Sequence, residues 1–126
     1  PRRALPILEE RWESNADEGD LAGALADAYA GTGQETKAAE FYQTAIDKGG
    51  GPEWWARMGT VDAARAYEGL QSALNSAPES AETWAALGDF HRLRGETAEA
   101  RNAYDKARGI SPTVLVYEIR WRAMAD

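Results

Sequence analysis

Apolar side chains recur along most of the chain at intervals of three and four residues, the spacing that places them on one face of a helix. The first such segment carries Leu5, Leu8 and Trp12. Alanine is frequent and β-branched residues are few, so helix is favoured over strand throughout. The pattern predicts helices over residues 4–14, 19–31, 35–48, 53–59, 61–76, 81–93, 96–109 and 113–125.

Glycine and proline mark the boundaries between these segments. Gly33 and Gly95 are placed to turn the chain between two helices, and Pro78 and Pro112 are placed to end helices. The stretch DKGGGPE at 47–53 is typical of a loop. It leaves the next helix only about two turns long.

The helical pattern repeats along the sequence. Residues 81–114 share several residue types with the segment 62 positions earlier, and a shorter third copy lies between them. Small residues allow two antiparallel helices to approach, and large residues fill the space between them. The positions that carry the repeat are Leu25, Ala26, Tyr29, Ala38, Tyr42 and Ala45 in the first copy, Ala66, Leu70, Ala73 and Pro78 in the second, and Trp84, Leu87, Gly88, Ala100, Tyr104, Ala107 and Pro112 in the third.

The third copy resembles a tetratricopeptide repeat (TPR), a helix–turn–helix unit of 34 residues with the pattern W-x2-L-G-x2-Y…A-x3-F…P. His91 stands where tyrosine is usual. The first copy matches less fully, since Ala22 replaces the tryptophan and Gly50 the proline, and the middle copy matches only in its second half. The resemblance covers about three quarters of the chain.

The resemblance implies an all-α fold, a right-handed α-solenoid of antiparallel helix pairs, because a single pair cannot bury its apolar face and neighbours must stack. It implies one domain with three TPR-like repeats and a helix at each end. The expected divisions are an N-terminal helix within 1–18, repeats at 19–52, 53–80 and 81–114, and a capping helix within 115–126.

Composition and charge limit the chemistry of the chain. It has 126 residues, no cysteine, one histidine and a net charge of −7. The absence of cysteine excludes disulfides and thiolate metal sites, and the glycines at 49–51 lack the Gly-Lys-Ser/Thr that completes a phosphate loop. The negative charge opposes binding to nucleic acid, and no apolar run approaches the roughly 20 residues of a membrane-spanning helix. We expect no cofactor, no metal and no enzymatic activity, with His91 in a packing position between helices.

Proteins of the TPR family usually line a groove with their first helices, so the resemblance implies a binding surface for a protein or peptide. A subgroup clamps a carboxylate there with Lys, Asn and Arg, which Gly23 and Asp27 cannot supply. An acidic groove favours a basic or neutral partner; alternatively, the acids only keep an exposed helix face soluble. The groove candidates, grouped by helix face, are Asp20, Gly23, Asp27 and Ala30, then Glu82, Ala85, Asp89 and Arg92.

Two adjacent tryptophans, Trp54 and Trp55, are further binding candidates. Adjacent helical residues point about 100° apart, so one short helix cannot bury both fully. Either both pack within the chain, or one packs while the other contacts a partner, since tryptophan is enriched at binding hot spots.

The last predicted helix is apolar over more than half of its turn, through Val114, Tyr117, Trp121 and Met124, widened by Leu115 and Ile119. It is predicted to cap the stack, with Glu118, Arg120 and Arg122 on its wet side. A truncated fourth repeat or a docking surface are the alternatives.

The function that follows is a protein–protein interaction scaffold that binds a partner segment in its groove. Two other classes stay open. One is a regulatory or assembly segment of a larger protein, possibly an enzyme, and the first residue, Pro1 rather than Met, is consistent with this. The other is a structural piece of a longer repeat array that forms homo-oligomers through its terminal helices.

Overall fold

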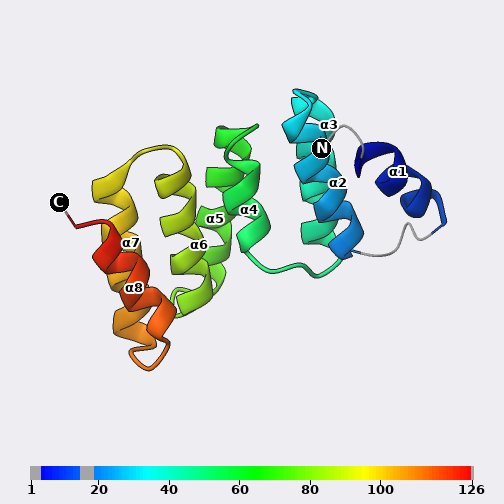
Figure 1. Ribbon diagram of the computed structural model, residues 1–126. Coiled ribbons are helices and arrows are strands. Elements are labelled where there is room, and N and C mark those ends of the chain that lie inside the picture. The colour runs from blue at the N-terminus through cyan, green and yellow to red at the C-terminus, as the bar shows by residue number, and fades with distance from the viewer. Residues whose placement is uncertain (1–3, 15–18, 126) are drawn as a thin grey trace.

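The structure is a computed structural model, and it describes residues 4–14 and 19–125 (Figure 1). These residues form helices and no strands. The helices are α1 (Ala4–Ser14), α2 (Gly19–Gly31), α3 (Glu35–Asp47), α4 (Glu53–Met58), α5 (Ala63–Ser76), α6 (Ala81–Leu93), α7 (Thr97–Ile110) and α8 (Leu115–Ala123). Each lies within two residues of the bounds that the sequence pattern predicts. None of the described helices is long and apolar enough to cross a membrane.

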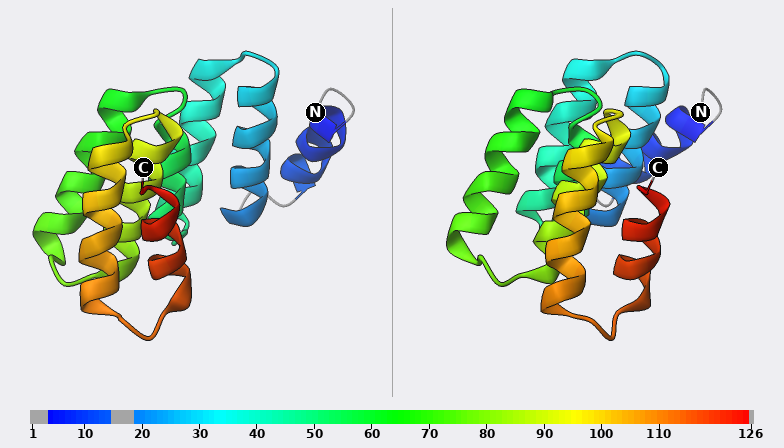
Figure 2. Two further views of the ribbon diagram at one scale, coloured as in Figure 1. Left: turned by 60° about the vertical axis from the view of Figure 1, so that its left-hand side comes forward. Right: turned by 90° about the vertical axis from the view of Figure 1, so that its left-hand side faces the viewer.

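The helices form antiparallel pairs, α2 with α3, α4 with α5 and α6 with α7, and the pairs stand side by side in one row (Figures 1 and 2). Helix α1 packs against α2 at one end of the row, and α8 packs against α7 at the other. The all-α solenoid of three helix pairs with a further helix at each end is therefore confirmed.

Local sequence sets where the helices begin and turn. The side chain of Asp62 accepts a hydrogen bond from the backbone N–H of Arg65 and starts α5, and Ser80 does the same for Thr83 at the start of α6. Gly33 and Gly95 have φ values of +80° and +76° in the turns of the first and third pairs. Residues with a Cβ rarely adopt a positive φ, which explains why glycine occupies both turns.

The core lies between the paired helices, at the positions that carry the repeat. Alanines at the helix crossings are fully buried, and large side chains fill the spaces beside them. The small residues therefore set how closely the helices approach, as the repeat pattern predicts. The fully buried repeat residues include Leu25, Ala26, Ala38, Ala45, Ala66, Leu70, Ala100, Tyr104 and Ala107.

The short helix α4 is held by its two tryptophans, each of which lies against a glycine of another helix. A side chain at Gly23 of α2 would collide with the ring of Trp54. A Cβ at Gly69 of α5 would lie only 2.5 Å from the ring of Trp55. Both tryptophans are half-buried and pack on the main core, so the prediction that one short helix cannot bury both fully is confirmed. Contact of either with a partner stays a prediction.

Candidate functional site

A carboxylate near the end of α2 joins three helices. The hydroxyl of Tyr42 on α3 donates a hydrogen bond to Oδ1 of Asp27 at 2.5 Å. Nη1 of Arg57 on α4 donates to Oδ2 of the same carboxylate at 2.7 Å. The guanidinium also lies 4.8 Å from the ring of Trp54. Asp27 therefore connects the first helix pair to the second.

The same arrangement occurs at the equivalent place in the third pair. The hydroxyl of Tyr104 on α7 donates to Oδ1 of Asp89 on α6 at 2.5 Å. Nη1 of Arg120 on α8 donates to Oδ2 at 3.2 Å. Arg92 adds a second guanidinium, with its Nε 3.1 Å from the Tyr104 hydroxyl. The Asp89 side chain is only 15% exposed, against 43% for Asp27.

Burial and these hydrogen bonds keep the two tyrosines neutral. Burial, and then the hydrogen bond to Asp89, raises the pKa of Tyr104 to about 12. Burial and Asp27 likewise raise the pKa of Tyr42. The hydrogen bond with Tyr104 is the main cause that raises the pKa of Arg92. Each cluster is thus a carboxylate held between a neutral hydroxyl and at least one guanidinium.

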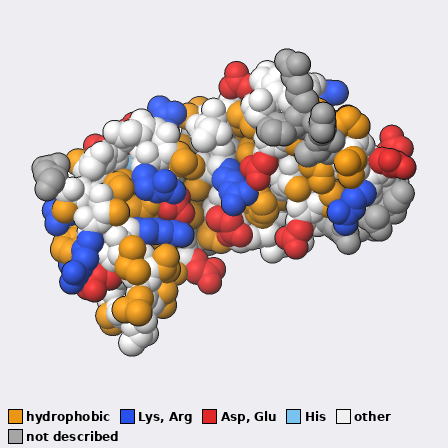
Figure 3. All heavy atoms as spheres, in the orientation of Figure 1, with side chains coloured by type: hydrophobic (Ala, Val, Ile, Leu, Met, Phe, Trp, Pro, Cys, Tyr) orange, Lys and Arg blue, Asp and Glu red, His pale blue; other side chains and the backbone are white. Residues whose placement is uncertain are grey.

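A cleft of about 600 Å³ lies between the first helices of the row, and side chains of both Tyr–Asp–Arg clusters line it, except that of Tyr104. A second hollow of about 460 Å³ continues it toward α8 and shares Glu53, Asp89 and Arg120 with it. Figure 3 shows basic and acidic side chains alternating across the middle of this face, and hydrophobic side chains over α8. The residues lining the first cleft are Asp27, Ala30, Tyr42, Glu53, Ala56, Arg57, Thr60, Asp89, Arg92, Leu93 and Arg120.

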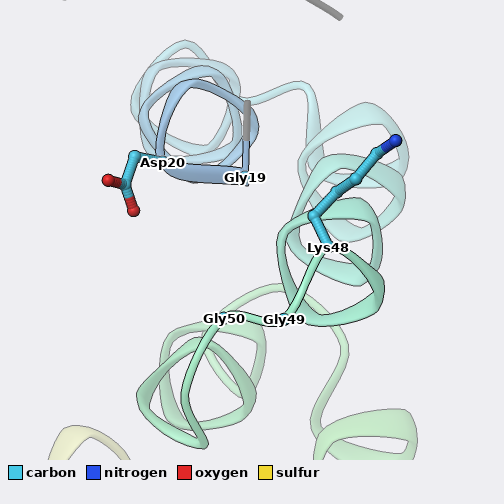
Figure 4. Close-up of a pocket in the computed structure, with 5 residues that line it drawn as sticks. All are labelled: Gly19, Asp20, Lys48, Gly49 and Gly50. Atoms are coloured by element: carbon cyan, nitrogen blue, oxygen red, sulfur yellow. The ribbon is translucent and has the colours of Figure 1, made fainter. Parts of the chain in front are cut away.

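The structure brings most, but not all, of the predicted groove residues together. Asp27, Asp89 and Arg92 line the first cleft, and Glu82 lines the second hollow. Asp20 lies elsewhere, beside a hollow of about 410 Å³ formed with the end of α3 and the glycine loop that follows it. There the side chains of Asp20 and Lys48 point away from each other (Figure 4).

Gly23, which the spacing places on the groove face, is instead buried beneath Trp54. Trp54 and Trp55 are not among the residues that line the first cleft or the second hollow. Sequence spacing identifies the face of a helix, but a larger side chain from the next helix can cover part of that face. This is why Gly23 is not available in the cleft.

Three features of the site were not predicted, namely the guanidiniums of Arg57 and Arg120 and the role of the two tyrosine hydroxyls. The sequence contains a signal for them. Asp27 precedes Tyr42 by 15 residues and Asp89 precedes Tyr104 by the same number. The arginines follow their aspartates by 30 and 31 residues. An acid, a hydroxyl and a cation that recur together at nearly the same spacing indicate a contact that is repeated within the fold, rather than two free acids.

His91 lies on the other side of α6, in a small aromatic cluster. Its Nδ1 is 2.9 Å from Oε1 of Glu96, and its ring meets those of Phe90 and Tyr67 at centroid distances of 5.1 and 6.2 Å. The hydrogen bond with His91 is the main cause that lowers the pKa of Glu96. His91 therefore packs between helices and holds the α6–α7 turn.

Antiparallel helix pairs stacked in a row, with small residues at the crossings, define a helical-repeat protein. The family model for the tetratricopeptide repeat matches residues 20–47 and 81–113, which correspond to the α2–α3 and α6–α7 pairs. These two segments are tetratricopeptide repeats. The α4–α5 pair, with its shortened first helix, lies between the two matched segments.

Solved structures share this fold at low sequence identity. A crystal structure of MamA is 18% identical, with a TM-score of 0.54, over 96% of this chain and 74% of that one. MamA from residue 41 to the end, from Desulfovibrio magneticus RS-1, is 19% identical, with a TM-score of 0.55, over 98% and 73%. YrrB, described as a TPR protein with an unusual peptide-binding site, is 16% identical, with a TM-score of 0.53, over 98% and 66%. No curated protein matches the sequence.

Proposed function

We propose that the chain is a protein-interaction module whose cleft receives an extended segment of a partner protein. The TPR fold supports protein–protein interaction in general. The observation that carries the narrower proposal is the cleft itself, which is lined by the first helices of all three pairs and includes the aspartates and arginines of both Tyr–Asp–Arg clusters. The clusters fix these polar side chains before a partner arrives, which lowers the entropy lost on binding.

The charges of the cleft favour a neutral segment. Asp27, Asp89 and Glu53 are matched in the first cleft by three arginines, and Glu82 adds one carboxylate in the second hollow. Because both aspartates already bind guanidiniums, they attract a basic partner less than two unpaired acids would. A basic residue of the segment would be placed best beside Glu53 and Glu82, which are exposed.

Affinity would come from apolar contacts, since exposed ion pairs each contribute only about 0.2–1 kcal/mol. Leu93 and Val116 are both partly exposed and lie on the walls of the two hollows. Apolar side chains of an extended segment would pack on them, while its backbone would use the open hydrogen-bonding positions of the arginines.

The test is site-specific photo-crosslinking to the partner captured from the native source. A photoreactive residue at Thr60, which is exposed in the cleft, should crosslink to one continuous segment of the partner. The same residue at Ser72, exposed on α5, is the matched control and should not. Leu93→Asp should weaken capture while leaving the fold intact. Crosslinking from Ser72 but not from Thr60 would reject the cleft as the binding site.

A further inference from the structure

One side of α8 is apolar and uncovered in the described structure. Tyr117 is buried against the third helix pair. Trp121 has the guanidinium of Arg108 3.7 Å from its ring centroid and that of Arg101 at 4.6 Å. Leu115 and Ile119 lie on the other side, one helical turn apart, and are 70% and 63% exposed. Two large apolar side chains at this spacing form a stripe suited to contact with another helix.

The position of α8 in the row indicates what such a stripe would contact. Arg120 of α8 binds Asp89 as Arg57 of α4 binds Asp27, so α8 stands in the place of a first helix. Helix α4, in that place, is covered by its own second helix α5 and by α6. The uncovered side of α8 therefore corresponds to a side of α4 that is covered by another helix.

Helix α1, at the opposite end, stands in the place of a second helix. It packs on α2 as α3 packs on α4, α5 on α6 and α7 on α8. Its Ala4 and Leu8 precede Ala38 and Tyr42 of α3 by 34 residues, one repeat length. Its outer surface also carries an exposed apolar side chain, since Ile7 is 60% exposed.

The two terminal helices carry opposite charge. Three carboxylates and one guanidinium lie on α1, and one carboxylate and two guanidiniums lie on α8. The exposed charges include Glu10 and Glu13 on α1 and Arg122 on α8. Opposite charge beside an apolar stripe favours contact between these two surfaces over contact of either surface with itself.

We propose that α8 of one copy docks on α1 of a second copy, head to tail, so that a first helix and a second helix from different copies complete one antiparallel pair. The contact uses Leu115 and Ile119 on α8 and Ile7 on α1. None of these lines the first cleft or the second hollow, so variants at these positions test the contact separately from the proposed partner binding. It is heterologous, and a docked pair keeps a free α1 surface on one copy and a free α8 surface on the other, so association continues to short chains or a closed ring. A contact between two single helices buries little surface, so the association is weak and we expect to observe it only at high protein concentration.

The experiment is sedimentation velocity across a wide concentration range with two blocking variants. Ile119→Asp places a charge in the α8 stripe, and Ile7→Asp places one on α1. The parent should form larger species as concentration rises. Each variant alone should associate more weakly, with its dissociation constant raised at least about tenfold, and should be monomeric at concentrations where the parent has begun to associate. Circular dichroism checks that both variants are folded, and Leu93→Asp, in the cleft, should associate as the parent does.

Mixing the variants gives the decisive result. The Ile119→Asp chain keeps an intact α1 surface and the Ile7→Asp chain keeps an intact α8 surface, so the mixture should form one 1:1 complex and nothing larger. Self-association of Ile7→Asp at parental strength would overturn the proposal and indicate contact between two α8 helices. A parent that stays monomeric at every concentration would also overturn it. The cleft is tested separately, by crosslinking at Thr60.

Discussion

At the scale of single residues, Asp27 and Asp89 hold neighbouring helices together. Each carboxylate accepts one hydrogen bond from a tyrosine hydroxyl of its own helix pair. It accepts another from an arginine on the first helix of the following unit, α4 for Asp27 and α8 for Asp89. A hydrogen bond to a charged group contributes more than a neutral one, and removing it from a half-buried carboxylate leaves that carboxylate less well solvated. These contacts therefore stabilise the stack as well as shape the cleft.

Tyr104→Phe should lower the free energy of unfolding by roughly 1–3 kcal/mol, because Asp89 loses its closest hydrogen bond while the ring remains packed. Urea unfolding measures this directly. Tyr67→Phe is the matched control, since Tyr67 is partly exposed and its described contacts are through its ring. Equal stability of the two variants would show that the Tyr104 hydroxyl contributes nothing to the fold.

The buried tyrosines also predict how stability depends on pH. The pKa values of Tyr29 and Tyr104 are raised to about 12, so the folded state disfavours the phenolate. A raised folded-state pKa means that the stabilisation is complete below the ordinary pKa near 10 and is lost as pH rises toward 12. Urea midpoints measured from pH 9 to 12 should fall over this interval. The decrease should be smaller in Tyr104→Phe, and an identical decrease would argue against a raised pKa of Tyr104.

Residue identity alone could predict which of these positions are buried but not all of their partners. The repeat pattern describes packing, so it correctly placed Ala38, Ala100 and Tyr104 in the core. It did not place Arg57 or Arg120, because each lies on the following unit and reaches its aspartate only when the units stack. The predicted acidic groove is therefore better described as a cleft in which both aspartates bind arginines.

At the scale of the element, close packing depends on a few glycines that lie beneath aromatic rings. A side chain at Gly88 of α6 would collide with the ring of Tyr104 on α7. Gly23 and Gly69 accept the rings of Trp54 and Trp55 in the same way. The shortened α4 was predictable from its loop and length, but these glycine contacts were not, because they join residues of different helices.

Gly88→Leu should destabilise the chain by roughly 1–3 kcal/mol, because the larger side chain overpacks the α6–α7 crossing. The matched control is Gly109→Ala on α7, where an added Cβ meets no atom within 4 Å. That substitution should be neutral or stabilise by up to about 1 kcal/mol, since alanine favours helix. Thermal melts of both variants make the comparison, and a Gly88→Leu variant as stable as the parent would contradict the packing assignment.

At the scale of the whole molecule, the main contacts of each described helix pair are with its neighbours, so stability is distributed along the row. The α2–α3 pair is joined to the rest through α4, by Trp54 against Gly23 and by Arg57 on Asp27. Helix α8 is joined through Tyr117, Trp121 and Arg120. The two arginines therefore hold equivalent places at two different junctions.

Removing each arginine should loosen only its own junction. Arg57→Ala should raise amide hydrogen exchange in α2 and α3 and leave α7 and α8 unchanged, whereas Arg120→Ala should raise it in α8 alone. Both ion pairs are partly exposed, so each change should cost only about 0.2–1 kcal/mol, slightly more for Arg57 because it also stacks on Trp54. Hydrogen exchange measured by mass spectrometry resolves the helices separately. Uniform acceleration across all helices in either variant would mean that the row unfolds as one cooperative unit, and the clusters would then stabilise the whole domain rather than link neighbouring units.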